Sequence, residues 1–153
     1  MHTAHMIDAL NKAVALENTA ILQYKQHALL VRGFWRKVFA DFFAAESRSA
    51  LDHACKFGQK IVALGGVPTV EVSAMVRQSL DLEEMLSQDL ELEREAMQAY
   101  LAAWDLADDD VALRAMLEEH IESEQRDIEE LEMSLGMVQT GAVTPEVNLQ
   151  IVT

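Results

Sequence analysis

Apolar residues recur every three or four positions along most of the chain, which is the spacing of an α-helix with one buried face. The residues that carry this spacing most clearly are Leu10, Val14, Ile21, Ala28, Phe39, Phe43, Phe57, Ile61, Leu64, Leu117, Ile121, Ile128, Leu131 and Leu135. A half-buried strand would instead alternate apolar and polar residues. The pattern therefore predicts an all-α protein.

The positions of six glycines and two prolines divide the chain into long segments. The segments free of helix breakers, or nearly so, predict helices over residues 4–32, 34–64, 80–106 and 111–135. Each helix has about 25–30 residues and is roughly 40 Å long. Three aspartates, Asp108 to Asp110, precede the last helix, where negative charge suits a helix N-terminus.

The connections between these helices predict the topology. Short links join the first helix to the second and the third to the fourth, so each pair should form an antiparallel hairpin. About 15 residues, 65–79, separate the two hairpins, which is enough to run back along a bundle. We therefore expect a four-helix bundle with one long crossover between helices two and three, over residues 1–140. Residues 141–153 contain Pro145 and several β-branched residues, and are expected to form an extended C-terminal tail.

Charge and composition restrict the function. The 153 residues include 12 basic and 26 acidic ones, for a net charge of −14. This charge disfavours a nucleic-acid partner and favours cations. No apolar run approaches the ~20 residues that cross a bilayer, so no membrane partner is expected. The N-terminus lacks the pattern of a secretion signal and Cys55 is the only cysteine, so we expect a cytoplasmic protein.

Ionisable residues interrupt the apolar face of every predicted helix. Glu17 lies between apolar positions of the first helix, Glu93 in the third and Glu124 in the fourth, while Glu46 and His53 share the inward face of the second. Other polar residues near these positions are Tyr24, Asp89, Tyr100, His120 and Asp127. A buried carboxylate without a partner costs several kcal/mol, so it takes a proton or binds a cation. Carboxylates with one or two imidazoles suit iron, manganese or zinc.

Other side chains are expected to have ordinary structural roles. Any single glutamate of so acidic a chain is more simply explained as surface. We expect His2 and His5 to lie in a frayed terminus and His27 to be an exposed or interface residue. Cys55 is expected to be a small buried thiol.

The chain resembles the bacterioferritin branch of the ferritin-like superfamily from Leu10 to about Leu135. The matching stretches are Leu10-Asn11-Lys12, Glu17, Gln23-Tyr24, Glu46-Ser47, Asp52-His53-Ala54, Leu64-Gly65-Gly66-Val67-Pro68, Leu82-Glu83-Glu84-Met85-Leu86, Asp89-Leu90 and Glu93. The resemblance implies a four-helix bundle that oxidises ferrous iron at a di-iron centre and stores the ferric mineral inside a protein cage. A shorter run, Val31-Arg32-Gly33-Phe34, is similar to the mini-ferritins, which form 12-subunit cages.

The resemblance also implies a ligand set, of which two members are changed here. In the family, two helices each give one glutamate and the other two each give Glu-x-x-His. Glu17 and Glu93 match the single glutamates. The second-helix motif falls on Ala50-Leu51-Asp52-His53, so its glutamate is replaced by alanine. The fourth-helix motif falls on Glu124-Gln125-Arg126-Asp127, so its histidine is replaced by aspartate.

Neighbouring side chains offer replacements for the changed ligands. Glu46 lies one helical turn before Ala50, and His120 one turn before Glu124. The predicted altered site consists of Glu17, Glu46, His53, Glu93, His120, Glu124 and Asp127, with Tyr24 as a residue that hydrogen-bonds a ligand or is itself oxidised. The family's haem-binding methionine corresponds to Leu51, so haem is not expected.

Three functions remain open at this stage. The first is iron binding, oxidation and storage by a homo-oligomeric cage with an altered dinuclear site. The second is a non-catalytic cage subunit, or a partner that co-assembles with another ferritin-like chain, as the loss of a glutamate at Ala50 suggests. The third is other di-metal chemistry, such as peroxide disproportionation by manganese.

Overall fold

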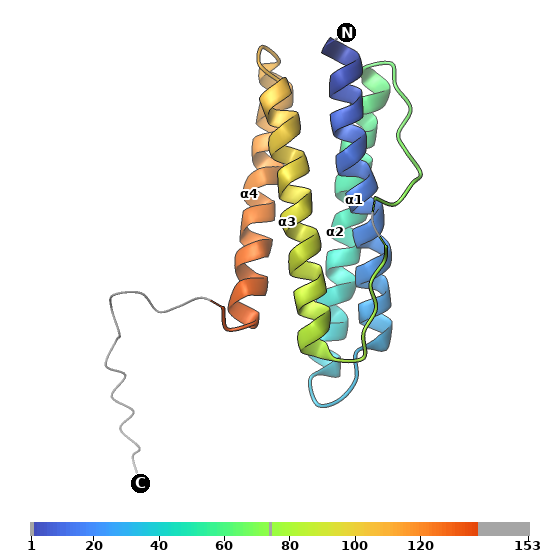
Figure 1. Ribbon diagram of the computed structural model, residues 1–153, viewed down its shortest axis with the longest axis vertical. Coiled ribbons are helices and arrows are strands. Elements are labelled where there is room, and N and C mark those ends of the chain that lie inside the picture. Colours follow the sequence, from blue (N-terminus) through green and yellow to red (C-terminus); the bar gives the residue numbers. More distant parts are fainter. Residues whose placement is uncertain (1, 74, 138–153) are drawn as a thin grey trace, which may run out of the picture.

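The computed structural model describes residues 2–73 and 75–137, and four long helices account for most of them (Figure 1). The helices are α1 (His2–Leu30), α2 (Arg36–Ala63), α3 (Leu82–Leu106) and α4 (Val111–Ser134). Every predicted boundary lies within two residues of the observed one. Within the described ranges, no helix is long and apolar enough to cross a membrane. The predicted tail, residues 141–153, lies outside these ranges.

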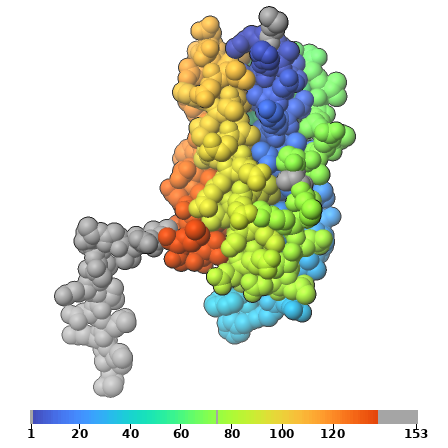
Figure 2. Space-filling model, in the orientation of Figure 1, coloured from blue at the N-terminus to red at the C-terminus, as the bar shows by residue number. Residues whose placement is uncertain are grey.

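The helices form the predicted bundle with a long crossover. Helices α1 and α2 form one antiparallel hairpin, α3 and α4 form the other, and α1 packs along both α2 and α3. The crossover leaves the end of α2 and returns beside α1 to the start of α3 at the opposite end of the molecule (Figure 1). The space-filling view shows this segment on the surface, and the turn between α1 and α2 protruding at one end (Figure 2).

Two aspartates begin the helices of the second hairpin. Asp81 accepts a hydrogen bond from the backbone N–H of Glu84 at 2.9 Å, and Asp110 accepts one from Leu113 at 3.0 Å. Each satisfies a backbone donor that the first helical turn leaves without a partner. The bond from Leu113 also lowers the pKa of the Asp110 carboxyl. The expectation that acidic residues mark the start of α4 is therefore confirmed.

Asparagine side chains on α1 hold the crossover in place. Asn11 donates to the carbonyl of Val67 at 3.1 Å and accepts from the N–H of Thr69 at 2.8 Å. Two turns further along, Asn18 donates to the carbonyl of Glu71 at 2.9 Å. These bonds pair backbone groups of a segment that lacks regular structure, and so fix its path along the bundle.

Replacing each of two glycines next to the crossover by alanine is expected to change the stability in opposite directions. A Cβ at Gly66 would lie 2.8 Å from Cγ2 of Ile7 and 3.0 Å from that of Ile61, whereas one at Gly58 would meet Pro68 at an ordinary 3.5 Å. We expect Gly66→Ala to lower the free energy of unfolding by about 1–3 kcal/mol through overpacking. Gly58 lies within α2, so Gly58→Ala should raise it by up to about 1 kcal/mol.

Urea denaturation of the two variants and the parent measures both changes. Equal stability of the two variants would contradict the packing described at Gly66.

Candidate metal centre

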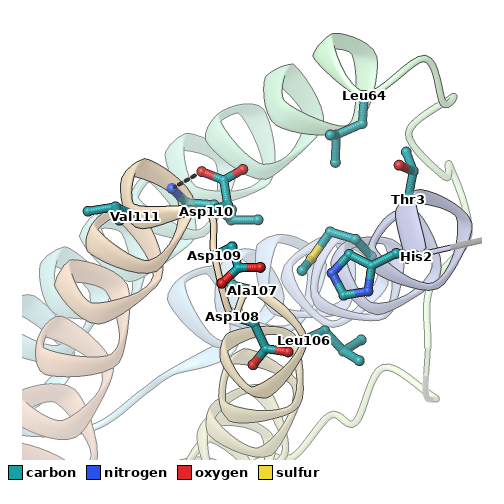
Figure 3. Close-up of a pocket in the computed structure, with 11 residues that line it drawn as sticks. His2, Thr3, Leu64, Leu106, Ala107, Asp108, Asp109, Asp110 and Val111 are labelled. Atoms are coloured by element: carbon teal, nitrogen blue, oxygen red, sulfur yellow. Dashed lines mark hydrogen bonds between the residues drawn. The ribbon is translucent and has the colours of Figure 1, made fainter.

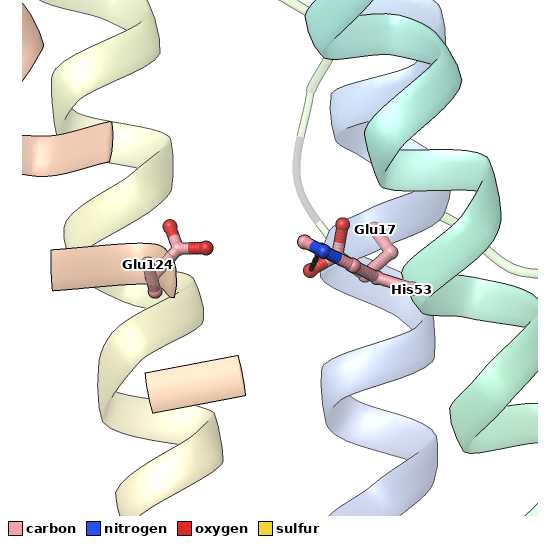
Figure 4. Close-up of side chains that lie close together, drawn as sticks. All are labelled: Glu17, His53 and Glu124. Atoms are coloured by element: carbon pink, nitrogen blue, oxygen red, sulfur yellow. Dashed lines mark ion pairs between the residues drawn. The ribbon is translucent and has the colours of Figure 1, made fainter. Parts of the chain in front are cut away.

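Three helices bring potential metal ligands together in the middle of the bundle. Glu17 of α1, His53 of α2 and Glu124 of α4 each offer one donor atom, and these atoms all lie within 4.8 Å of one another. Figure 4 shows the Glu124 carboxylate pointing toward Glu17 and His53. His53 Nδ1 lies 3.7 Å from Glu17 Oε1. Two carboxylates and an imidazole at this spacing form a mixed nitrogen and oxygen site for a divalent cation.

Glu124 is the member of the cluster whose hydrogen bonding is incomplete among the described residues. Its side chain is only 1% exposed, and its Oε1 has no hydrogen-bond partner among the described residues. Burial, followed by the charge of Glu93, raises the pKa of Glu124 far above its usual range. A buried polar atom without a partner is unfavourable unless a ligand fills the space.

Two tyrosines link the glutamates of α1 and α3. The Tyr24 hydroxyl donates to Glu93 Oε1 at 2.7 Å, and the Tyr100 hydroxyl donates to Glu17 Oε1. Each tyrosine lies seven residues after the glutamate of its own helix and contacts the glutamate of the other. Tyr24 thus contacts Glu93, which is one of the predicted ligands. Tyr100 was not assigned to the site, although its identical seven-residue spacing from Glu93 was the available signal.

Glu46 and Asp127 add further carboxylates from α2 and α4. Burial raises the pKa of Glu46 to about 8, and the next contributions come from the charges of Asp127 and Glu93. Burial and the charge of Glu93 likewise raise the pKa of Asp127 to about 6. Burial raises the pKa of Glu17 to about 7, with a smaller contribution from Glu93. Burial and the neighbouring negative charges thus favour the protonated forms of these carboxyl groups, and a bound cation would favour the ionised forms.

The pKa values of the two histidines of the cluster, His53 and His120, are shifted in opposite directions. Burial disfavours charge on His53, but the adjacent Glu17 outweighs it and the pKa of His53 is raised. Burial lowers the pKa of His120. The backbone carbonyl of Met116 can only accept a hydrogen bond, so His120 Nδ1 carries a proton and donates to it at 2.7 Å. In the neutral ring, Nε2 then carries no proton and keeps a lone pair. The ring centroids of His53 and His120 lie 5.0 Å apart. A hydrogen bond from one ring nitrogen to a backbone carbonyl, as His120 makes, commonly orients metal-binding histidines.

All the residues of the predicted site therefore lie in one region, although they are not equally close. Glu17, His53 and Glu124 share the tight group, and the charge of Glu93 acts on both glutamates of this group. Glu46 and Asp127 interact with the cluster through charge, and the ring of His120 lies beside that of His53.

Three expectations about other side chains are wrong. His2 and His5 do not lie in a frayed end, because α1 already includes both. His27 is completely buried and pairs with Asp89, where an exposed or interface position was expected. Cys55 is exposed rather than buried. It lies two residues after His53, a rotation of about 200° around the helix, and so points away from the bundle axis.

A cavity of about 720 Å³ lies at the end of the bundle where α1 begins, and it shares no residue with the carboxylate cluster. Figure 3 shows His2 beside Asp108, Asp109 and Asp110, with the hydrogen bond by which Asp110 caps α4. Glu17 lies 15 residues further along α1 than His2, a distance of roughly 22 Å. This cavity is therefore separate from the candidate metal centre.

Comparison with known proteins identifies the family. A ferritin-like domain model matches residues 7–139. The chain is 30% identical to a bacterioferritin of Streptomyces coelicolor, over 88% of this chain and 81% of that protein. It is 27% identical to a bacterioferritin of Brucella melitensis, over 87% of this chain and 84% of that protein. A crystal structure of a ferritin-like diiron-carboxylate protein from Bacillus anthracis superposes with a TM-score of 0.84 at 32% identity, and covers 88% of this chain and 98% of that one.

Proposed function

This chain belongs to the ferritin-like domain family, and we propose that it binds Fe(II) as its substrate and oxidises it at a carboxylate-rich dinuclear site. Membership of this family, together with bacterioferritin relatives, supports a broad role in iron storage. The proposal goes further, because it assigns the oxidation to an altered set of ligands. Its central claim is that the site holds two ions despite the replacements at Ala50 and Asp127.

One observation carries the proposal: a buried Glu124 oxygen that has no partner within residues 2–73 and 75–137 lies close to donor atoms of two other helices. Packing alone does not account for this arrangement, because a buried polar oxygen without a partner is unfavourable even when the carboxyl group is protonated. A cation among Glu17, His53 and Glu124 satisfies the free oxygen and the neighbouring charges together. The donor set, two carboxylates and one imidazole, fits ferrous iron.

The second iron position is richer in oxygen. Burial, followed by the charges of neighbouring carboxylates, raises the pKa values of Glu46 and Asp127, and the charge of Glu93 acts on both. We assign this position to Glu46, Glu93 and Asp127, with Glu124 between the two irons. Asp127 then supplies an oxygen where the family has a histidine, which suits a hard cation such as Fe(II) or Mn(II). Zinc would fit the position near His53 better than this oxygen-rich position, because imidazole is a preferred ligand of zinc.

Two ferrous ions held close together would each give one electron to the same two-electron acceptor, either dioxygen, which is reduced to peroxide, or a peroxide, which is reduced to water. Tyr24 fixes the orientation of Glu93 through its hydroxyl, and Tyr100 does the same for Glu17. His120 is held with its Nε2 lone pair free and is available to the position near His53. The carboxyl protons leave as the metal binds, so affinity should increase with pH.

Aerobic addition of Fe(II) at two ions per subunit tests the proposal. Near-ultraviolet absorbance follows the ferric product. We expect a fast phase that saturates near two irons per subunit in the parent and is lost in Glu124→Ala. Glu122→Ala, which removes an exposed carboxylate from the same helix, should leave the fast phase intact. Oxidation in the parent no faster than in buffer would contradict the proposal.

The alternative function is a non-catalytic cage subunit, and Ala50 is the observation that favours it. Ala50 is buried between Glu46 and His53 on the inward side of α2 and offers no ligand atom. In that case the chain binds metal weakly and contributes to a homo-oligomeric cage, alone or with another ferritin-like chain that carries the complete site. Restored oxidation on mixing with such a partner would support this alternative.

A further inference from the structure

His27 forms a buried polar network next to the carboxylate cluster, which the proposed function does not use. Its side chain is 0% exposed. Nδ1 lies 2.9 Å from Asp89 Oδ2, and Nε2 lies 3.1 Å from Gln88 Oε1. The ring also packs edge-on against Phe43, with 5.4 Å between ring centroids. Both ring nitrogens are therefore engaged, and their partners determine which of them carry protons.

The partners of Gln88 determine the orientation of its amide group. Its nitrogen faces the backbone carbonyl of Gln78 at 3.4 Å and the carboxylate of Glu84 at 3.3 Å. Both of these groups accept hydrogen bonds, so the amide nitrogen must point toward them. The amide oxygen then points toward His27, and His27 Nε2 must donate.

Asp89 is oriented in the same way by a second glutamine. Gln23 accepts from the backbone N–H of Arg77 at 3.1 Å, so its amide nitrogen donates to Asp89 Oδ1 at 2.9 Å. Asp89 Oδ1 therefore accepts from Gln23, and Oδ2 of an ionised Asp89 accepts from His27 Nδ1. With protons on both nitrogens, His27 is an imidazolium cation in the bundle core.

We propose that His27 is a positioning residue, which pairs as an imidazolium with Asp89 and thereby fixes α3 against α1 where Glu93 enters the metal centre. Asp89 precedes Glu93 by one helical turn, and Tyr24, which holds Glu93, precedes His27 by one turn. Gln23, Tyr24 and His27 thus hold two successive carboxylates of α3 from a single stretch of α1. The proposal rests on the proposed function only in that Glu93 is taken as a metal ligand.

The pair also limits the negative charge near the cluster. The charge of Asp89 acts on Glu46, and that of Glu93 acts on Asp89. Without its cation, Asp89 would add another buried negative charge close to those of the site. The other charged groups next to the network are already engaged, since Arg77 pairs with Glu91 and donates to the Gln88 carbonyl.

Nitrogen-15 NMR of metal-free protein labelled at histidine tests the charge directly. At pH 8 we expect protons on both ring nitrogens of His27, with the signal assigned by its loss in His27→Gln. A ring that carries a proton on Nε2 alone, with Asp89 protonated, would overturn the proposal. This measurement does not depend on iron chemistry, so it stands apart from the test of ferrous oxidation.

Binding of Co(II), followed by its visible absorbance, tests the positioning role. We expect His27→Gln and Asp89→Asn each to weaken the binding by ~10-fold or more, because each leaves an unpaired polar group beside Glu93. The double variant replaces both charges with neutral hydrogen-bonding groups and should recover to within ~3-fold of the parent. His5→Gln, on the exposed side of α1, is the control. Parent-like affinity in both single variants would overturn the role, even if the parent fails to oxidise iron.

Discussion

The metal-free protein is expected to lose stability as the pH rises from about 5 to about 8, and a bound divalent cation should reverse the loss. Folding raises the pKa of Glu17 from 4.5 to about 7 and that of Glu46 from 4.5 to about 8. Between these limits the folded state binds more protons than the unfolded state, so the free energy of unfolding falls with increasing pH. Below pH 4.5 both states are protonated and the stabilisation is complete.

The expected loss is large because Glu17 is fully buried. One pKa unit corresponds to about 1.4 kcal/mol, so the shift at Glu17 alone is worth about 3 kcal/mol. Glu46 extends the loss toward pH 8. A cation that replaces the protons removes the repulsion, and this stabilisation grows with the ratio of free metal to the dissociation constant.

Urea denaturation at pH 5, 6.5 and 8, with a chelator or with Co(II), measures both effects. Glu17→Gln should flatten the pH dependence of the chelated protein and remove most of the stabilisation by Co(II). Glu95→Gln, at an exposed position of α3, should leave both unchanged. A metal-free protein that becomes more stable between pH 5 and 8 would show that the carboxyl groups do not repel one another as described.

Replacement of Ala50 by glutamate should accelerate ferrous oxidation. Ala50 lies three residues before His53, at the position where the family carries a glutamate, and it is buried on the inward side of α2. A carboxylate there would supply an additional bridge and negative charge between two irons. We expect Ala50→Glu to increase the initial rate by ~10-fold or more, which corresponds to about 1.4 kcal/mol in the barrier.

The neighbouring Leu51→Glu provides the matched control. It adds the same charge to the same helix, but at an exposed position. Stopped-flow absorbance at two Fe(II) per subunit compares the two variants with the parent. If both variants accelerate oxidation equally, general attraction of cations explains the result and Ala50 is not part of the site.

The fold and most of the candidate site were predictable because helical periodicity fixes which side chains share a face. Glu17, Glu93 and Glu124 each interrupt the apolar face of a helix. That face is buried regardless of which other helix packs against it, so the three glutamates are buried as well. The spacing within one helix also places Glu46 and His53 on one side of α2. These predictions use information that is local to each helix.

The features that were missed depend on contacts between helices. His27 is buried because α3 presents Asp89 and Gln88 to it, and nothing within α1 specifies those partners. Tyr100 contacts Glu17 across the bundle, and its role follows only when α1 and α3 are known to pack together. Cys55 differs, since its exposure follows from its position two residues after the inward-facing His53.

Anomalous diffraction from crystals soaked anaerobically in Fe(II) tests the central claim most directly. Data collected on both sides of the iron absorption edge locate iron without reference to activity. The account predicts two iron peaks per subunit, one among Glu17, His53 and Glu124 and one beside Glu46 and Asp127. A single peak, or iron bound only away from these side chains, would contradict a dinuclear site in this chain.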